Sequence, residues 1–143
     1  MRQVLDQFQI TAFPQNAAIA RDRVKVTAEA IGFSGSPLGE LEVAVGEAVT
    51  NAILYGSIDD DNTVTVRCYL EELVNLFSVE ITDKGNGFDP DHVRQAENED
   101  ALGGRGLRLM RVLTDRLLLY YDENGMNVCL SKRIPTAIPG ELA

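Results

Sequence analysis

Apolar side chains recur every three or four residues along two long segments in the first part of the chain. The spacing predicts one helix from Pro14-Gln15-Asn16 to about Ile31, which Gly32 ends, and a second from Ser36-Pro37 to about residue 56. Proline is favoured in the first turn of a helix, which supports this second start. A strand over residues 3–12 precedes both helices. The expected buried stripe of the second helix consists of Leu38, Leu41, Val45, Ala48, Val49 and Ala52.

The pattern changes to alternation in the middle of the chain. Residues 64–70 and 77–82 place apolar side chains at every second position, which is typical of strands with one buried face. Residues 104–113 predict a short helix, and residues 116–121 and 126–132 predict a hairpin around Asn124-Gly125. Strands with one apolar face and helices with one apolar stripe must bury each other. We therefore expect an α/β two-layer sandwich, with a mixed, mainly antiparallel sheet of about five strands and three helices on one face.

The chain length fits one folded unit. A chain of 143 residues is long enough for its own core, and no linker or repeat divides it, so we expect a single domain over residues 1–143. Residues 91–103 are rich in charge and bounded by glycines, and we expect them to form a lid over a site. The tail over residues 135–143 is expected to be frayed.

Charge and cysteine content narrow the functional class. The 13 Lys and Arg residues against 22 Asp and Glu residues give a net charge of −9, which argues against a direct nucleic-acid partner. The sequence has no membrane-spanning apolar run and no signal-peptide core, so we expect a cytoplasmic protein without a membrane partner. Cys68 and Cys129 form no CxxC motif, which favours reduced, buried thiols.

Two polar residues interrupt the apolar run of the second predicted helix. Glu47 and Asn51 are four residues apart, so they lie one turn apart on one side of the helix and reach a common ligand. A carboxylate accepts a proton or orients a nucleophile, and an amide oxygen ligates a hard cation. The plainer interpretation is that both residues flank the buried stripe and face water.

A third polar residue lies on a predicted core face. Asp83 continues the period of Phe77, Val79 and Ile81, and a carboxylate there needs a hydrogen-bond donor. It also opens the segment Asp83-Lys84-Gly85-Asn86-Gly87. Taken alone, this segment is equally consistent with a glycine turn after a strand.

A second glycine segment, Gly103-Gly104-Arg105-Gly106, opens the last predicted helix. Backbone N–H groups and the helix dipole favour an anion at such a position, although a flexible connector has a similar composition. Neither glycine segment matches GxxxxGK[ST] or a strand-borne GxGxxG followed by an acidic residue. The P-loop and dinucleotide-binding folds are therefore excluded.

The three motifs occur in a distinctive order: Glu-x-x-x-Asn on a helix, Asp-x-Gly-x-Gly after a strand, and Gly-x-Gly-Leu on a helix. This order resembles the GHKL ATPase superfamily, which includes gyrase, sensor histidine kinases and the mismatch-repair ATPases. The short length and the segment from Glu47 to Ile53 are similar to the anti-sigma factor serine/threonine kinases of bacterial partner-switching systems. The likeness covers nearly the whole chain.

The resemblance implies a function and a set of partners. It implies an ATP-binding anti-sigma factor that sequesters a sigma factor and phosphorylates a serine or threonine of an antagonist protein. It also implies ATP and Mg²⁺ as cofactors, and a homodimer as the assembled form.

The resemblance assigns roles to individual residues. It implies that Glu47 is the general base or orienter for the attacking hydroxyl, that Asn51 ligates Mg²⁺, and that Asp83 accepts the adenine amino group. Arg21, on the first helix, matches an arginine that related proteins use at the partner surface, although an exposed helical arginine is an equally good interpretation. The implied cofactor-binding set is completed by Gly85, Gly87, Gly104, Arg105, Gly106, Leu107 and Asn127.

Two departures from the family pattern bear on the expected function. Leu102 stands where the family often has an arginine directed at the γ-phosphate, which leaves open a nucleotide-gated binding module that transfers no phosphate. The threonine pair of the family's last strand falls on Met126 and Asn127, of which Asn127 keeps a polar side chain. A free-standing histidine-kinase domain is excluded, because the single histidine, His92, lies in the expected lid.

Overall fold

The computed structural model describes residues 2–56, 63–83, 105–123 and 125–135, and every helix and strand in these ranges lies within two residues of its expected position. Gly32, at φ +115°, follows the end of the first helix as predicted. The expected lid and all of the expected tail except Pro135 fall outside the described residues. In chain order the elements are β1 (Arg2–Thr11), α1 (Asn16–Ala30), α2 (Gly35–Gly56), β2 (Thr63–Glu71), β3 (Leu76–Asp83), α4 (Arg105–Leu113), β4 (Arg116–Asp122) and β5 (Gly125–Arg133).

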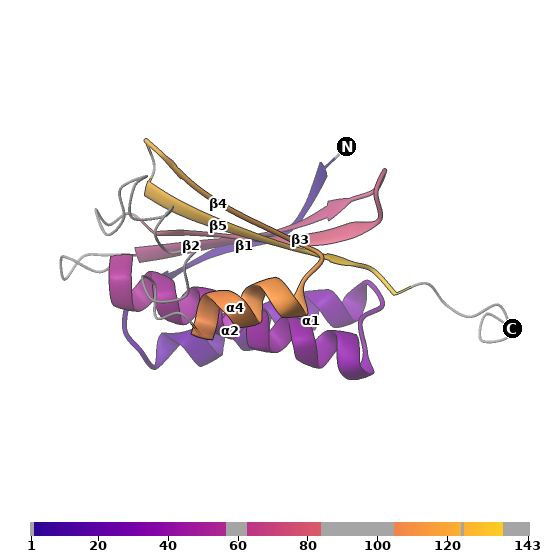
Figure 1. The fold of residues 1–143 in the computed structure, drawn as a ribbon, viewed down its shortest axis with the longest axis horizontal. Helices are drawn as coiled ribbons and strands as arrows, with labels where there is room; N and C mark the ends of the chain where they lie inside the picture. The colour runs from indigo at the N-terminus through magenta and orange to yellow at the C-terminus, as the bar shows by residue number, and fades with distance from the viewer. Residues whose placement is uncertain (1, 57–62, 84–104, 124, 136–143) are drawn as a thin grey trace, which may run out of the picture.

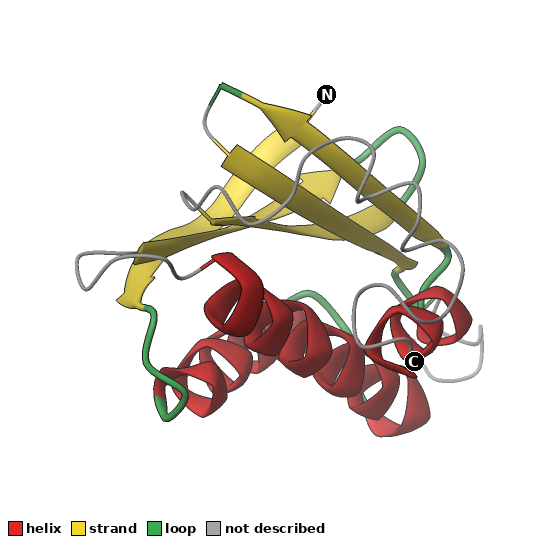
Figure 2. Cartoon of the chain, turned by 60° about the vertical axis from the view of Figure 1, so that its left-hand side comes forward, coloured by secondary structure: helices red, strands yellow, loops and turns green. Residues whose placement is uncertain are grey.

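The strands form one open sheet in the order β1-β2-β3-β5-β4. Each pairing between the described strands is antiparallel, so the sheet is antiparallel rather than mixed. The three helices that the structure describes lie together on one face of this sheet, which confirms the predicted two-layer sandwich (Figures 1 and 2). Among the described helices, none is both long and apolar enough to cross a lipid bilayer.

The core lies between the sheet and α2. Phe77, Val79 and Ile81 of β3 are almost completely buried, as the alternation predicted, and β3 packs directly against α2. The ring of Phe33, just before α2, meets the ring of Phe77 at a centroid distance of 5.7 Å. A buried side chain of this size contributes about 1.5–3 kcal/mol to folding, so the apolar faces fix which side of each strand meets the helices.

The opposite face of the sheet is polar. Arg67 and Glu80 form an ion pair at 3.2 Å across β2 and β3, and the Tyr120 hydroxyl donates a hydrogen bond to Glu80 at 2.9 Å. Partial burial and this bond to a carboxylate raise the pKa of Tyr120 to about 12. On the same face of the sheet, Ser78 and Ser131 share a buried hydrogen bond of 2.8 Å. This face is held by side-chain networks instead of a helical layer.

Candidate functional site

The first helix turn of α4 lies directly against the Glu47/Asn51 pair of α2. A Cβ atom built on Gly106 would lie 2.8 Å from Glu47 Oε2 and 3.4 Å from Asn51 Nδ2. The first distance is shorter than real Cβ contacts, so only glycine allows this approach without a shift. The structure therefore brings together two motifs that are 55 residues apart in sequence, between Asn51 and Gly106.

Glu47 also borders a surface depression between α1 and α2. The depression has a volume of about 350 Å³ and is lined by Ala17, Arg21, Glu42, Val43, Gly46, Glu47 and Thr50. Arg21 is only partly exposed, with 42% of its side chain accessible, and its Cδ atom passes 3.5 Å from a Cβ built on Gly46. The Glu47 carboxylate thus lies between the N-terminus of α4 and a depression that Arg21 lines.

Asp83 occupies the last position of β3 on the helix side of the sheet. It is 2% exposed and lies between Val64 of β2 and Met126 of β5 in the strand register. Its placement on the core face confirms the expected strand period. It lies on β3, whereas Glu47 and Asn51 lie on α2, so a second element contributes to the candidate site.

Asn127 does not share the face of Asp83. Strand register pairs Asn127 with Thr82, and the Thr82 hydroxyl donates to Asn127 Oδ1 at 2.6 Å on the polar side of the sheet. Met126 stands opposite Asp83 instead. The expectation that Asn127 joins the nucleotide site does not fit this register, since neighbouring residues of a strand point to opposite faces.

Of the remaining expected residues, Leu107 and Arg105 lie within the described ranges and the others do not. Leu107 is 3% exposed and packs in the core beside Met110, so its side chain secures α4 and does not reach into the depression. Arg105 is the first residue of α4. The glycines at 85, 87 and 104 lie outside the described residues, as does Leu102.

The structure adds three residues that the motifs did not indicate. Thr50 and Gly46 line the depression beside Glu47, and a glycine inside a long helix is the sequence signal for a close approach of this kind. Lys132 of β5 reaches the C-terminal end of α4, where its ammonium group contacts Glu40 of α2 and the Leu113 carbonyl of α4. No local pattern indicated Lys132, because its contacts are with residues distant in sequence.

The side chains present are suited to a phosphate group and a magnesium ion. Within the described ranges, no three His, Cys, Asp or Glu side chains gather to hold a metal by themselves. Mg²⁺, however, is usually held by one or two protein oxygens together with substrate phosphates. The Asn51 amide would supply one oxygen, and Gly106, which has no side chain, brings the N-terminus of α4 close to the pair, where backbone N–H groups favour an anion.

Comparison with known sequences gives a consistent family. Residues 10–132 match the histidine kinase-like ATPase domain model. A serine-protein kinase RsbW from Listeria monocytogenes is 33% identical over 136 residues, which cover 88% of this chain and 85% of the relative. The RsbW of Staphylococcus aureus is 31% identical over 112 residues, covering 72% of this chain and 70% of the relative.

Solved structures support the fold. The chain resembles a Mycobacterium tuberculosis protein solved with its RsbU and RsbW domains, at a TM-score of 0.67 and 18% identity. That match covers 92% of this chain and 33% of the solved chain, so this chain spans about a third of that protein. A blue-light activated histidine kinase from Erythrobacter litoralis matches at a TM-score of 0.58 and 20% identity, over 82% of this chain and 65% of the other.

Proposed function

Because the chain belongs to the histidine kinase-like ATPase family, we propose that it is an ATP-dependent protein-serine/threonine kinase and anti-sigma factor. It sequesters a sigma factor and phosphorylates a serine or threonine of an antagonist protein. The observation that carries this proposal is the close approach of Gly106 to Glu47 and Asn51, which leaves no room for a Cβ. The similarity to serine-protein kinases of Listeria and Staphylococcus supports the reaction type. A sigma factor is a cytoplasmic partner, so this function implies a cytoplasmic location.

Glu47 acts on the nucleophile. Its carboxylate accepts the proton of the substrate hydroxyl while the hydroxyl oxygen bonds to the γ-phosphorus and the bond from that phosphorus to the bridging β-phosphate oxygen breaks. The position of Glu47 between α4 and the depression supports this role, because a hydroxyl presented from the depression meets the carboxylate first. A positioned general base typically contributes about 10²–10⁴-fold to the rate.

Asn51 and α4 act on the phosphates. ATP with Mg²⁺ supplies the transferable phosphoryl group, and phosphoryl transfer depends mainly on positioning and charge neutralisation. The Asn51 amide oxygen would ligate the ion, and the N-terminal N–H groups of α4 would bind phosphate oxygens; the close approach of Gly106 to Asn51 supports both roles. Asp83 accepts a hydrogen bond from the adenine amino group, and its buried place on the helix side supports this assignment.

Arg21 contributes to the partner surface. It shares the depression with Glu47, together with the exposed side chain of Val43. An antagonist that presents its serine to Glu47 must cover this depression, so Arg21 lies within reach of the same partner. The position supports a docking role for Arg21 rather than a role in nucleotide binding.

The nucleotide-gated binding module is not the favoured alternative. That alternative depended on Leu102, which lies outside the described residues. The similarity to relatives named as serine-protein kinases favours transfer over binding alone.

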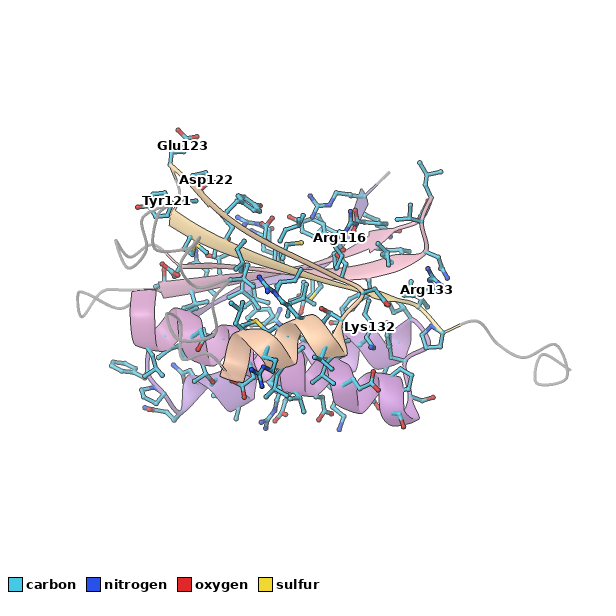
Figure 3. All side chains as sticks on the ribbon, in the orientation of Figure 1. Arg116, Tyr121, Asp122, Glu123, Lys132 and Arg133 are labelled. Carbon is cyan, nitrogen blue, oxygen red and sulfur yellow. The ribbon has the colours of Figure 1, made fainter. Side chains whose placement is uncertain are left out.

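We further propose that two copies associate through the polar sheet face. Leu118 and Tyr120 are 48% and 40% exposed on that face, which none of the described helices covers. Arg116 lies at one end of β4, and Asp122 and Glu123 lie at the other (Figure 3). A two-fold arrangement with antiparallel strands brings the acidic end of one copy to the basic end of the other. Light scattering should give a dimer for the parent and a monomer for Leu118→Lys, and a monomeric parent would contradict the proposal.

The reaction is tested by incubating the protein with γ-³²P-labelled ATP, Mg²⁺ and the antagonist protein encoded by the same genome. We expect label on one serine or threonine of the antagonist, identified by mass spectrometry, and none on the same antagonist carrying alanine there. Tight ATP binding without any transfer would leave the nucleotide-gated module as the better description.

A further inference from the structure

Lys132 joins three elements through one buried ammonium group. It lies on β5 opposite Phe77, on the helix side of the sheet, and its side chain is 11% exposed. Its Nζ atom donates a hydrogen bond to Glu40 Oε2 of α2 at 2.8 Å and to the backbone carbonyl of Leu113 at 2.7 Å. Figure 3 shows Lys132 beside the C-terminal end of α4.

The Leu113 carbonyl belongs to the last residue of α4. The final carbonyls of a helix have no partner within the helix, and the helix dipole makes that end attractive to a cation. Lys132 therefore caps α4 and neutralises Glu40 at the same time. Loss of the ammonium would leave both groups without this charge-assisted bond.

Further hydrogen bonds fix the same end of α4. The Thr114 hydroxyl donates to the Met110 carbonyl at 2.5 Å, and the Asp115 N–H donates to the Ser131 carbonyl at 2.9 Å. The Arg133 N–H donates to Asp115 Oδ2 at 2.6 Å. The C-terminal end of α4 is thus attached to β5, and its other end carries the approach to Glu47.

The spacing of these contacts links Lys132 to the candidate site. Glu47 lies seven positions after Glu40 on α2, and Leu113 lies seven positions after Gly106 on α4. Both intervals are two helical turns, or about 10 Å. The helices α2 and α4 run antiparallel and approach each other at two points, which are the same number of residues apart on both helices. Lys132 links the helices at one point, and Gly106 meets Glu47 at the other.

We propose that Lys132 is a positioning residue, which sets the distance between the N-terminus of α4 and the Glu47/Asn51 pair. The proposal rests on the kinase function given above. A helix of nine residues moves as one body. Without the Lys132 bonds its C-terminal end keeps the Asp115 bonds to β5 but is less firmly held, so α4 tilts and Gly106 shifts relative to Glu47. Lys132 itself touches no reacting group in this account.

The test compares Lys132→Met with Lys132→Arg, which keeps the charge and the donors. For Lys132→Met we expect kcat of phosphotransfer to fall about tenfold or more, because displacements near 1 Å cost up to about 10²-fold. The KM for ATP should rise by a smaller factor than kcat falls, because the shift of α4 affects its phosphate contacts while the adenine contact at Asp83 on β3 is untouched. Lys132→Arg should stay within about threefold of the parent. Arg23→Met is the matched control, because it breaks an ion pair of the same 2.8 Å length between α1 and β1, away from the site.

Hydrogen exchange provides a second measurement that does not depend on kinase activity. The amide of Met110, inside α4, should exchange at least about tenfold faster in Lys132→Met than in Arg23→Met. Glu40→Ala, which keeps the Leu113 bond, should show the same changes in smaller measure and serves if Lys132→Met does not fold. Parental kcat and parental exchange in a folded Lys132→Met variant would overturn the positioning role. A parent that transfers no phosphate would overturn the proposed function, while the exchange measurement still tests Lys132.

Discussion

Gly106→Ala separates the catalytic geometry from the stability of the fold. The new Cβ would lie 2.8 Å from Glu47 Oε2, whereas an ordinary carbon–oxygen contact is about 3.4 Å. The carboxylate, or the start of α4, must therefore retreat by about 0.6 Å. The atom in the way is the end of a flexible side chain, so the clash is relieved by a change of Glu47 rotamer rather than by unfolding.

The stability terms nearly cancel for this substitution. Alanine gains at most about 1 kcal/mol over glycine in a helix, and an off-rotamer Glu47 loses about 0.5–1.5 kcal/mol. We therefore expect the free energy of unfolding to stay within about 1 kcal/mol of the parent. Phosphotransfer should fall about 10- to 100-fold, because a shift of this size misaligns the base with the hydroxyl.

Gly39→Ala is the matched control for this experiment. It lies in the first part of α2, and a Cβ there meets no other atom within 4 Å. It should gain up to about 1 kcal/mol of stability and keep parental phosphotransfer. Urea unfolding and labelled-ATP transfer measure both quantities on both variants. Parental transfer by a folded Gly106→Ala protein would refute the placement of α4 against a catalytic carboxylate.

Two further substitutions test other parts of the account. Asp83→Asn should weaken Mg·ATP binding about tenfold or more in calorimetry, because it removes a charge-assisted bond to the adenine amino group; unchanged affinity would remove Asp83 from the site. Asp6→Asn breaks the ion pair with Arg23, whose hydrogen bond lowers the pKa of Asp6 in the folded state. A lowered folded pKa adds stability that is present above the unfolded pKa near 3.8 and is lost as the pH falls through the folded value. The melting temperature of the variant should therefore be slightly below that of the parent at pH 7. The difference in melting temperature should shrink as the pH falls below 4. A difference that does not depend on pH would contradict the ion-pair explanation.

The fold was predictable because its signals are local. Alternation in β2 and β3 and the apolar stripe of α2 set which faces are buried, and the structure keeps these assignments. The purely antiparallel sheet was not predicted, since strand direction depends on the order β1-β2-β3-β5-β4 and not on any single segment.

The candidate site was only partly predictable. The spacing of Glu47 and Asn51 indicated a shared helix face, but their contact with Gly106 depends on how α4 packs on α2. The pairing of Asn127 with Thr82 was not predictable from its place in a motif, because strand register depends on residues distant in sequence. Lys132 could not be foreseen, because Glu40 is 92 residues away in sequence.

The most direct test of the central claim is a comparison of Glu47→Gln with the parent in two measurements on the same preparation. ATP affinity should be unchanged, because the carboxylate acts on the hydroxyl and not on the nucleotide. Single-turnover transfer of labelled phosphate to the antagonist should fall about 10²–10⁴-fold, since the amide cannot accept the proton. Equal transfer rates for the variant and the parent would contradict the assignment of Glu47 as the general base.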